Sequence, residues 1–282
     1  MILAKKQHES LQMSLLMLFS FSLPLHPRVA SWVAFLLTIH WLVGTLSLTN
    51  FKKNFQSSAI IFWGFYLIHL LGLFYTTNLA EGYQRIETKL PLLIFPMIFF
   101  STSASQHVNK MLKIFVFGCL LATIYSFTLG IIKNYQTGMN WLFYTNLSGF
   151  IGFHPTYFSI YLLFSCFILL SLMMEEWIHF PMRRIMASAV LFWFVVFMLL
   201  LSSRMIILLM IVMFNLILIF WMYQNQKLFY GLVISVVTVL FSVSLLLNVP
   251  GLKERTYLTI NRFKNNNNKT KIDPRINLWS AS

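Results

Sequence analysis

The chain alternates long uncharged runs with short clusters of charged residues. A helix needs about 20 apolar residues to cross a bilayer, and nine of the uncharged runs approach or exceed that length. We therefore predict an all-α fold, a polytopic bundle of about nine transmembrane helices. The predicted helices lie near residues 11–24, 29–48, 58–76, 89–103, 111–133, 155–174, 185–202, 205–223 and 228–248. They form one membrane domain, residues 1–249, which is followed by a basic segment, residues 250–282.

Prolines interrupt this pattern in two places. Pro24 and Pro27 closely follow the first apolar run, so we expect the first two helices to form one tight pair. Pro91 and Pro96 lie in the fourth run, whose apolar part is short. Proline is tolerated in a membrane helix where neighbouring groups satisfy the carbonyl that it leaves without a partner.

Composition strengthens the membrane interpretation. Hydrophobic residues make up 58% of the chain and charged residues 10%, whereas soluble domains average about 45–50% and about 25%. So few charged residues cannot cover a water-facing surface. The net charge is +14, but the Lys and Arg residues stand in short clusters between apolar runs, which argues against nucleic-acid binding. Cys119 and Cys166 lie inside apolar runs, which excludes a disulfide framework.

The distribution of basic residues predicts the orientation, because short cytoplasmic loops are enriched in Lys and Arg. With the N-terminus in the cytoplasm, nine basic residues lie at inner connections and five at outer ones. The inner set is Lys5, Lys6, Lys52, Lys53, Lys110, Lys113, Arg183, Arg184 and Lys227, and the outer set is Arg28, Arg85, Lys89, Lys133 and Arg204. An odd number of spans places residues 250–282 outside. That segment has seven basic and two acidic residues, a net charge of +5, which points to an anionic ligand on the outer face.

Arg204 interrupts an otherwise uncharged region between the seventh and eighth predicted helices. One interpretation is an arginine that reaches the interface and anchors a helix end. The other is a guanidinium that grips a phosphate, since its planar fork allows bidentate contact. In the second case the neighbouring Ser203 would add a hydrogen bond.

His154 and Pro155 precede the sixth predicted helix. Pro155 suits the first helical turn, where its missing N–H is not needed. His154 is either a structural hydrogen-bonding residue or a polar, protonatable contact to a phosphate or sugar at the outer surface. Tyr157, in the first turn, belongs either to an interfacial aromatic belt or to a sugar-binding surface.

Two other segments carry basic residues on the outer side. Arg85 and Lys89 are four residues apart in the loop 77–89 and would share one face if that loop is helical. The loop is then either an amphipathic interfacial helix or a source of phosphate contacts. Near the end of the sequence Arg275 and Trp279 are also four residues apart, on one face of a possible helix; the alternative is a basic tail without a function.

The seven acidic residues are scattered along the sequence. We find no nucleotide-binding loop, no cluster of metal ligands and no Ser-His-Asp pattern in the sequence. We therefore expect neither a metal ion nor another cofactor.

Taken together, three motifs resemble the O-antigen ligase and polymerase family. They are His154-Pro155 at the start of an outer-facing helix, Ser203-Arg204 at a tight turn between helices, and Arg275-x-x-x-Trp279 in an outer segment. The motifs occur in the family's order. The loop that leads into Leu90-Pro91 is similar as well, and the resemblance covers most of the chain.

The resemblance implies a metal-independent glycosyltransferase on the periplasmic face of a Gram-negative inner membrane. Its donor would be a glycan linked to undecaprenyl diphosphate, which suits a compartment without nucleotide sugars. The acceptor would be a lipid A-core sugar for a ligase, or another lipid-linked repeat for a polymerase. By the same resemblance Arg204 and Arg275 would hold the diphosphate and neutralise the leaving group. The candidate catalytic residues are Arg204, Arg275 and His154, and the candidate substrate contacts are Arg85, Lys89, Tyr157, Ser203 and Trp279.

This sequence departs from the family's pattern at the end of the chain. Its members continue the outer loop, supply a histidine base there and return to the membrane, whereas this chain stops at Ser282. We therefore expect a fragment, or a protein that binds the donor and transfers little of it. Two alternatives stay open, a lipid-linked oligosaccharide flippase and a non-catalytic assembly partner. The basic residues favour an interfacial enzyme, because they cluster at helix ends and in the tail rather than deep in a central cavity.

Overall fold

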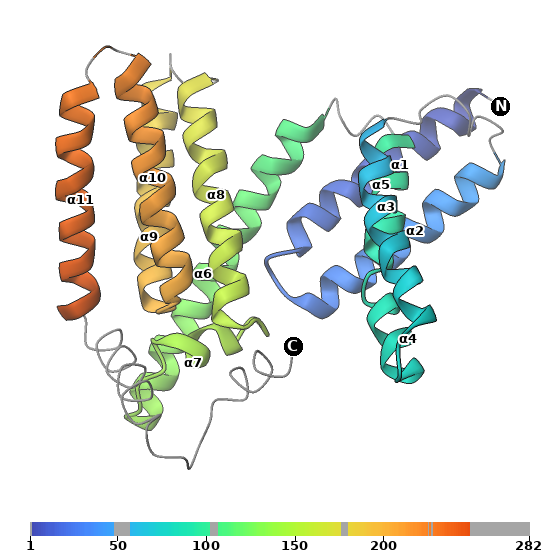
Figure 1. Ribbon diagram of the computed structural model, residues 1–282, viewed down its shortest axis with the longest axis horizontal. Coiled ribbons are helices and arrows are strands. Elements are labelled where there is room, and N and C mark those ends of the chain that lie inside the picture. Colours follow the sequence, from blue (N-terminus) through green and yellow to red (C-terminus); the bar gives the residue numbers. More distant parts are fainter. Residues whose placement is uncertain are drawn as a thin grey trace. The chain divides into compact units, whose positions relative to one another are not determined.

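The computed structural model describes residues 2–47, 57–101, 107–175, 180–224, 226 and 228–248. Within these ranges the chain forms α-helices and one short 3-10 helix, and no strand (Figure 1). The elements are α1 (Ile2–Ser22), α2 (Pro27–Ser47), α3 (Ser57–Leu71), η1 (Gly72–Phe74), α4 (Leu79–Glu87), α5 (Leu90–Ser101), α6 (Val108–Thr137), α7 (Tyr144–Gly149), α8 (Pro155–Glu175), α9 (Pro181–Leu200), α10 (Arg204–Gln224) and α11 (Leu228–Asn248). The all-α prediction is confirmed for this part of the chain.

Each of the nine predicted segments overlaps a helix within the described ranges, although 58–76 continues past α3 into η1 and the turn after it. The agreement is closest for α8, α10 and α11, each of whose bounds differs from the predicted one by at most one residue. Proline explains several of the starts, because Pro27, Pro155 and Pro181 each occupy the first helical position of α2, α8 and α9. Two short helices, α4 and α7, lie between the longer ones.

Five helical segments in the described ranges are long and apolar enough to cross a membrane. They are Pro27–Gly44, Val108–Thr137, Pro155–Met174, Pro181–Leu200 and Ile206–Gln224, while Ala59–Phe74 and Phe229–Thr238 are shorter apolar stretches. Two of the other predicted spans, which correspond to α1 and α5, are less suited to cross a membrane for physical reasons. The first turns of α1 are polar, and α5 has only 12 residues, about 18 Å of helix against a hydrocarbon core of about 30 Å.

Large apolar side chains are exposed along several of these helices. Trp32, Ile61, Phe192 and Phe229 each expose about 70% of their surface. A soluble protein rarely leaves contiguous apolar surface open to water, whereas in a bilayer the lipid chains cover it and every backbone hydrogen bond stays inside the helix. The described helices therefore belong to a membrane protein in a lipid bilayer.

The chain divides into two compact units. Unit 1 comprises Met1–Thr128, Phe150–Phe153 and Phe164–Phe192, and unit 2 comprises Leu129–Gly149, His154–Leu163 and Trp193–Ser282. In unit 1, α1 packs along α2, and α5 packs against both α2 and α3. A buried cluster joins α1, α2 and α5 to the start of α6: Leu16, Leu37, Trp41, Ile98 and Met111. The predicted tight pairing of the first two helices is confirmed by this packing.

Pro96 lies inside α5, where it cannot donate the helical hydrogen bond. One turn earlier on the same helix, the carbonyl of Leu93 accepts a hydrogen bond of 3.2 Å from the indole N–H of Trp63 on α3. The carbonyl that Pro96 leaves without its helical donor is that of Leu92, four residues earlier, so the bond from Trp63 lies beside the gap and does not fill it.

Unit 2 is built around aromatic side chains and a polar contact. Phe158, Phe194 and Phe197 are fully buried. α10 packs along α11, and Thr238 Oγ1 on α11 donates a hydrogen bond of 2.7 Å to Asn215 Oδ1 on α10. A polar bond between two apolar helices helps to set their alignment, because lipid-facing residues give no preference for one partner face over another.

Candidate functional site

His154 occupies the N-cap position of α8. Its carbonyl oxygen accepts the N–H of Phe158 at 3.2 Å, and its ring Nδ1 accepts the N–H of Thr156 at 3.4 Å. A ring nitrogen that accepts a hydrogen bond carries no proton, so the neutral imidazole holds its proton on Nε2. His154 therefore presents an N–H donor to its exposed side.

The same arrangement stands at the start of α2. His26 Nδ1 accepts the N–H of Arg28 at 3.2 Å, and His26 O accepts the N–H of Ala30 at 3.1 Å. Both histidines precede a proline at the first helical position, so His-Pro is a capping device that this chain uses twice. The structural interpretation of His154 thus has direct support. The sequence carries this signal in His26-Pro27, which our sequence analysis did not single out.

The surroundings distinguish the two histidines. The ring of His26 lies against Gly152, where a Cβ would come within 2.9 Å of Nε2. His154, in contrast, is exposed and lies edge to face with two tyrosine rings, Tyr144 at 6.3 Å and Tyr157 at 6.0 Å between ring centroids. Three rings with polar edges therefore gather at the start of α8, and Tyr157 is 65% exposed.

Tyr144 was not among the residues selected from the sequence. Its backbone has φ of +53°, a left-handed conformation that is costly for a residue with a side chain. The preceding loop holds it there, because Asn140 Oδ1 accepts the N–H of Leu142 at 3.2 Å and Asn140 O accepts the side-chain amide of Asn146 at 3.1 Å. No pattern of residue types predicts such a conformation.

The Ser202–Arg204 turn joins α9 to α10. Ser202 is buried and left-handed, with φ of +49°, and its N–H bonds to Leu199 O at 3.0 Å. Ser203 is the N-cap of α10, because its carbonyl accepts the N–H groups of Ile206 at 3.1 Å and Ile207 at 2.9 Å. Arg204 is consequently the first residue of α10. Ser203 is itself buried, so its side chain is less accessible to a ligand than the sequence suggested.

Phe158 and Phe197 bring the starts of α8 and α10 to the same end of unit 2. Phe158 lies one turn after Pro155, and Phe197 lies one turn before the end of α9; their ring centroids are 6.0 Å apart. The ends of α8, α9 and α10 and the short helix α7 lie together in Figure 1. His154 and the Ser203-Arg204 pair, distant in sequence, thus share one end of the unit.

This end of unit 2 favours negative charge. α8 and α10 both begin here, and a helix N-terminus carries a partial positive charge. His154 adds the Nε2–H donor, and Arg204 adds a formal positive charge at the first position of α10. Together these features suit an anion such as a phosphate. The Tyr144 and Tyr157 rings beside them would suit the flat face of a sugar.

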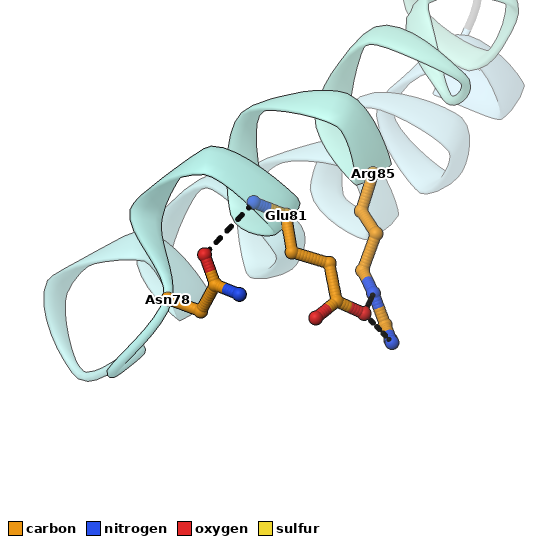
Figure 2. Close-up of polar contacts among 3 residues, drawn as sticks. All are labelled: Asn78, Glu81 and Arg85. Carbon is orange, nitrogen blue, oxygen red and sulfur yellow. Dashed lines mark hydrogen bonds and ion pairs between the residues drawn. The ribbon is translucent and has the colours of Figure 1, made fainter.

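Arg85 and Lys89 belong to unit 1, and the structure gives each a different partner; Figure 2 shows the partner of Arg85. α4 is capped by Asn78, whose side chain accepts the N–H of Glu81 at 3.2 Å. Arg85 forms an ion pair of 2.6 Å with Glu81 one turn earlier, and both side chains are mostly exposed. Such a pair contributes only about 0.3–0.5 kcal/mol, so an incoming phosphate can displace it.

The shared helical face expected for Arg85 and Lys89 is not formed. α4 ends at Glu87, and Lys89 lies in the turn that follows, where its N–H bonds to Ile86 O at 3.0 Å. Lys89 Nζ instead contacts His69 Nδ1 on α3 at 3.1 Å. The helix stops early because Thr88 closes its last turn, so the four-residue spacing no longer places the two side chains on one face.

Arg275 and Trp279, like the whole segment 250–282, lie outside the described residues. Among the described residues no three His, Cys, Asp or Glu side chains gather in a way that could hold a metal ion.

Comparison of the chain with protein families, with curated proteins and with solved structures finds no match. The interpretation of the site therefore comes from its own geometry and from the sequence motifs.

Proposed function

We propose that this protein is a membrane glycosyltransferase of the O-antigen ligase or polymerase type. It transfers a glycan from undecaprenyl diphosphate to a sugar hydroxyl, without a metal ion, on the periplasmic face of a bacterial inner membrane. In this proposal the N-terminus lies in the cytoplasm and residues 250–282 lie in the periplasm. The starts of α8 and α10 then lie at the periplasmic surface, where the lipid-linked donor is found.

The observation that carries the proposal is the contact of Phe158 with Phe197. It supports the placement of His154-Pro155 and Ser203-Arg204, two of the three motifs behind the resemblance, at one end of unit 2. Two helix N-termini and an arginine at one membrane surface are suited to a diphosphate. A donor lying in the bilayer would reach this end without leaving the lipid.

In the proposed reaction the acceptor hydroxyl oxygen attacks the anomeric carbon of the donor. The bond from that carbon to the diphosphate oxygen breaks, the diphosphate leaves with the electron pair, and the proton of the acceptor hydroxyl is released to water. Arg204 and Arg275 stabilise the negative charge that develops on the leaving group.

His154 would act through its Nε2–H. A neutral imidazole that holds its proton on Nε2 donates a hydrogen bond and does not remove a proton from the acceptor. We therefore propose that His154 donates to a diphosphate or sugar oxygen, with Tyr157 against the sugar. Ser203 positions the first turn of α10, and Trp279 is proposed as an additional sugar contact.

The experiment uses the purified 282-residue chain in lipid nanodiscs with an undecaprenyl diphosphate-linked glycan. Arg204→Lys keeps the charge and removes the planar fork. A hydrogen bond to a charged group contributes about 1.5–3 kcal/mol, so donor affinity should fall by about tenfold or more. Arg184→Lys, an exposed arginine near the other end of α9, is the matched control and should bind normally. Equal affinities for the two variants would contradict the role of Arg204.

Transfer itself is measured with two acceptors, lipid A-core and a second lipid-linked repeat. A product on lipid A-core indicates a ligase, and a longer lipid-linked glycan indicates a polymerase. The alternative function is a lipid-linked oligosaccharide flippase, which would move the donor across the bilayer of a proteoliposome and form no new glycosidic bond. Movement without transfer would favour the flippase and overturn the enzyme proposal.

A further inference from the structure

A chain of three polar side chains lies between α1 and α2. His8 Nδ1 and His40 Nε2 are 3.1 Å apart, and His40 Nδ1 is 2.5 Å from Gln12 Oε1. His8 and His40 are half-buried and Gln12 is buried. Their helices pack along one another in unit 1. Histidines in such a place are commonly explained as packing or helix–helix contacts, but the direction of these bonds allows a more specific conclusion.

The amide oxygen of Gln12 sets the direction of the whole chain. An oxygen of this kind only accepts, so His40 Nδ1 must donate and carries the proton of its ring. In a neutral ring His40 Nε2 is then an acceptor, and His8 Nδ1 must donate to it. It follows that the neutral ring of His8 has its unprotonated nitrogen at Nε2.

Gly44 makes room for that nitrogen. A Cβ built on Gly44 would overlap His8 Nε2, so the imidazole of His8 lies directly over a position on α2 where no side chain stands. Among the described residues no hydrogen bond to His8 Nε2 is found, and Gln12 Nε2 at the other end is buried without a partner. The series of hydrogen bonds thus ends at Gln12, while at His8 it leaves the Nε2 acceptor available.

Other titratable groups are carried by the elements packed around this pair. On α1 they are Glu9, which is exposed, and Lys5 and Lys6, whose side chains are not described; on α2 the remaining one is Arg28, near the other end of the helix. α5 has none, and α6, which adds Met111 to the same buried cluster, starts with Lys110 and Lys113 just after His107. These helices therefore carry more basic than acidic residues.

We propose that His8 and His40, closed at one end by Gln12, form a site that binds a single proton at His8 Nε2. The proton comes from a hydronium ion in the surrounding water: its O–H bond breaks, an N–H bond forms at His8 Nε2, and a water molecule is left. His8 Nδ1–H can then shift to His40 Nε2, so that the positive charge is shared by two rings and stabilised by the Gln12 carbonyl oxygen. Because this series of hydrogen bonds ends at Gln12, the proton enters and leaves at His8. The three residues therefore form a binding site and not a conducting path.

A second proton cannot bind while the pair is intact. It would place N–H groups on both His8 Nδ1 and His40 Nε2, which face each other at 3.1 Å with no acceptor between them. Two positive rings in partly buried surroundings would also repel each other. The second protonation should therefore separate this end of α1 from α2. The site would exist whether the protein transfers a glycan or carries one.

Histidine-labelled protein in nanodiscs tests the proposal by nitrogen NMR, with the seven histidines assigned by single substitutions. In the neutral state His8 and His40 should both carry the proton on Nδ1. His26 and His154 are internal controls with the opposite tautomer, because their Nδ1 atoms accept backbone N–H groups. On acidification His8 and His40 should change together and take up one proton between them. A proton on Nε2 of neutral His8, or independent titration of the two rings, would overturn the proposal.

Gly44→Ala removes the space for His8 without removing a titratable group. We expect the joint titration to be lost and the two histidines to take up one proton each. Gly64→Ala on α3 is the matched control, since a Cβ there meets nothing within 4 Å, and it should titrate like the wild type. Joint titration that survives Gly44→Ala would contradict the proposed geometry. The wild-type measurement decides the question by itself if the alanine variant does not fold.

Discussion

Phe158 and Phe197 meet nearly at right angles, with their ring planes 80° apart and their centroids 6.0 Å apart. Both side chains are fully buried. An edge-to-face pair of this kind is favourable beyond the area that it buries. It holds the first turn of α8 against the last turn of α9, and hence His154 at the same end of unit 2 as Arg204.

The coupling between these two rings can be measured. Phe158→Ala and Phe197→Ala should each lower stability in lipid, and the double variant should lose about 0.5–1.5 kcal/mol less than the two losses combined. Reversible unfolding from micelles gives the three values. Phe192→Ala, whose side chain is 70% exposed, is the control and should change stability little. Strict additivity would mean that the rings do not stabilise each other.

Substitutions of His154 can separate capping from ligand contact. Asparagine is a good N-cap residue, so His154→Asn should keep the helix stable, whereas His154→Ala should cost about 0.5–2 kcal/mol. If Nε2–H contacts the donor, both variants should bind the lipid-linked glycan more weakly. The same substitutions at His26 should follow the same order in stability without reducing donor affinity. Normal donor binding by His154→Asn would leave His154 with capping alone.

Ser202 provides a test of backbone strain. Its φ of +49° is easy for glycine and costly for other residues, while its Oγ makes only long contacts to Leu199 O and Leu200 O, 3.3 and 3.5 Å. Ser202→Gly should therefore raise stability, by up to about 1 kcal/mol, and Ser202→Val should lower it. Thermal unfolding in detergent compares the two with the wild type. A less stable glycine variant would show that the hydroxyl contacts outweigh the strain.

The proposed topology predicts which connections an impermeant maleimide can reach. In intact spheroplasts Ala80→Cys and Thr145→Cys should be labelled, and Phe180→Cys and Gln226→Cys only after the membrane is opened. All four positions are exposed, and the native Cys119 and Cys166 are buried, which keeps the background low. Labelling of position 180 with none at 80 or 145 would reverse the orientation.

Much of the secondary structure follows from the sequence alone. Uncharged runs of bilayer length determine where α8 to α11 lie, because a backbone in lipid must satisfy its own hydrogen bonds and the helix is the local way to do so. Proline at the first position of α2, α8 and α9 then determines where those helices begin. The candidate motifs at His154 and Arg204 could be selected for the same reason, since polar residues stand out where an apolar run starts or stops.

Which faces meet was decided only by the tertiary structure. α8, which carries Phe158, is apolar on all sides, so its periodicity does not indicate that Phe158 faces Phe197 on α9. The sequence separation of His8 and His40 gives no sign that Gly44 leaves a space for one ring beside the other. Tyr144 and Ser202 adopt left-handed backbone conformations only because the surrounding turns hold them there. Close packing depends on the shapes of partners far apart in the sequence, whereas helix formation in lipid depends on each run by itself.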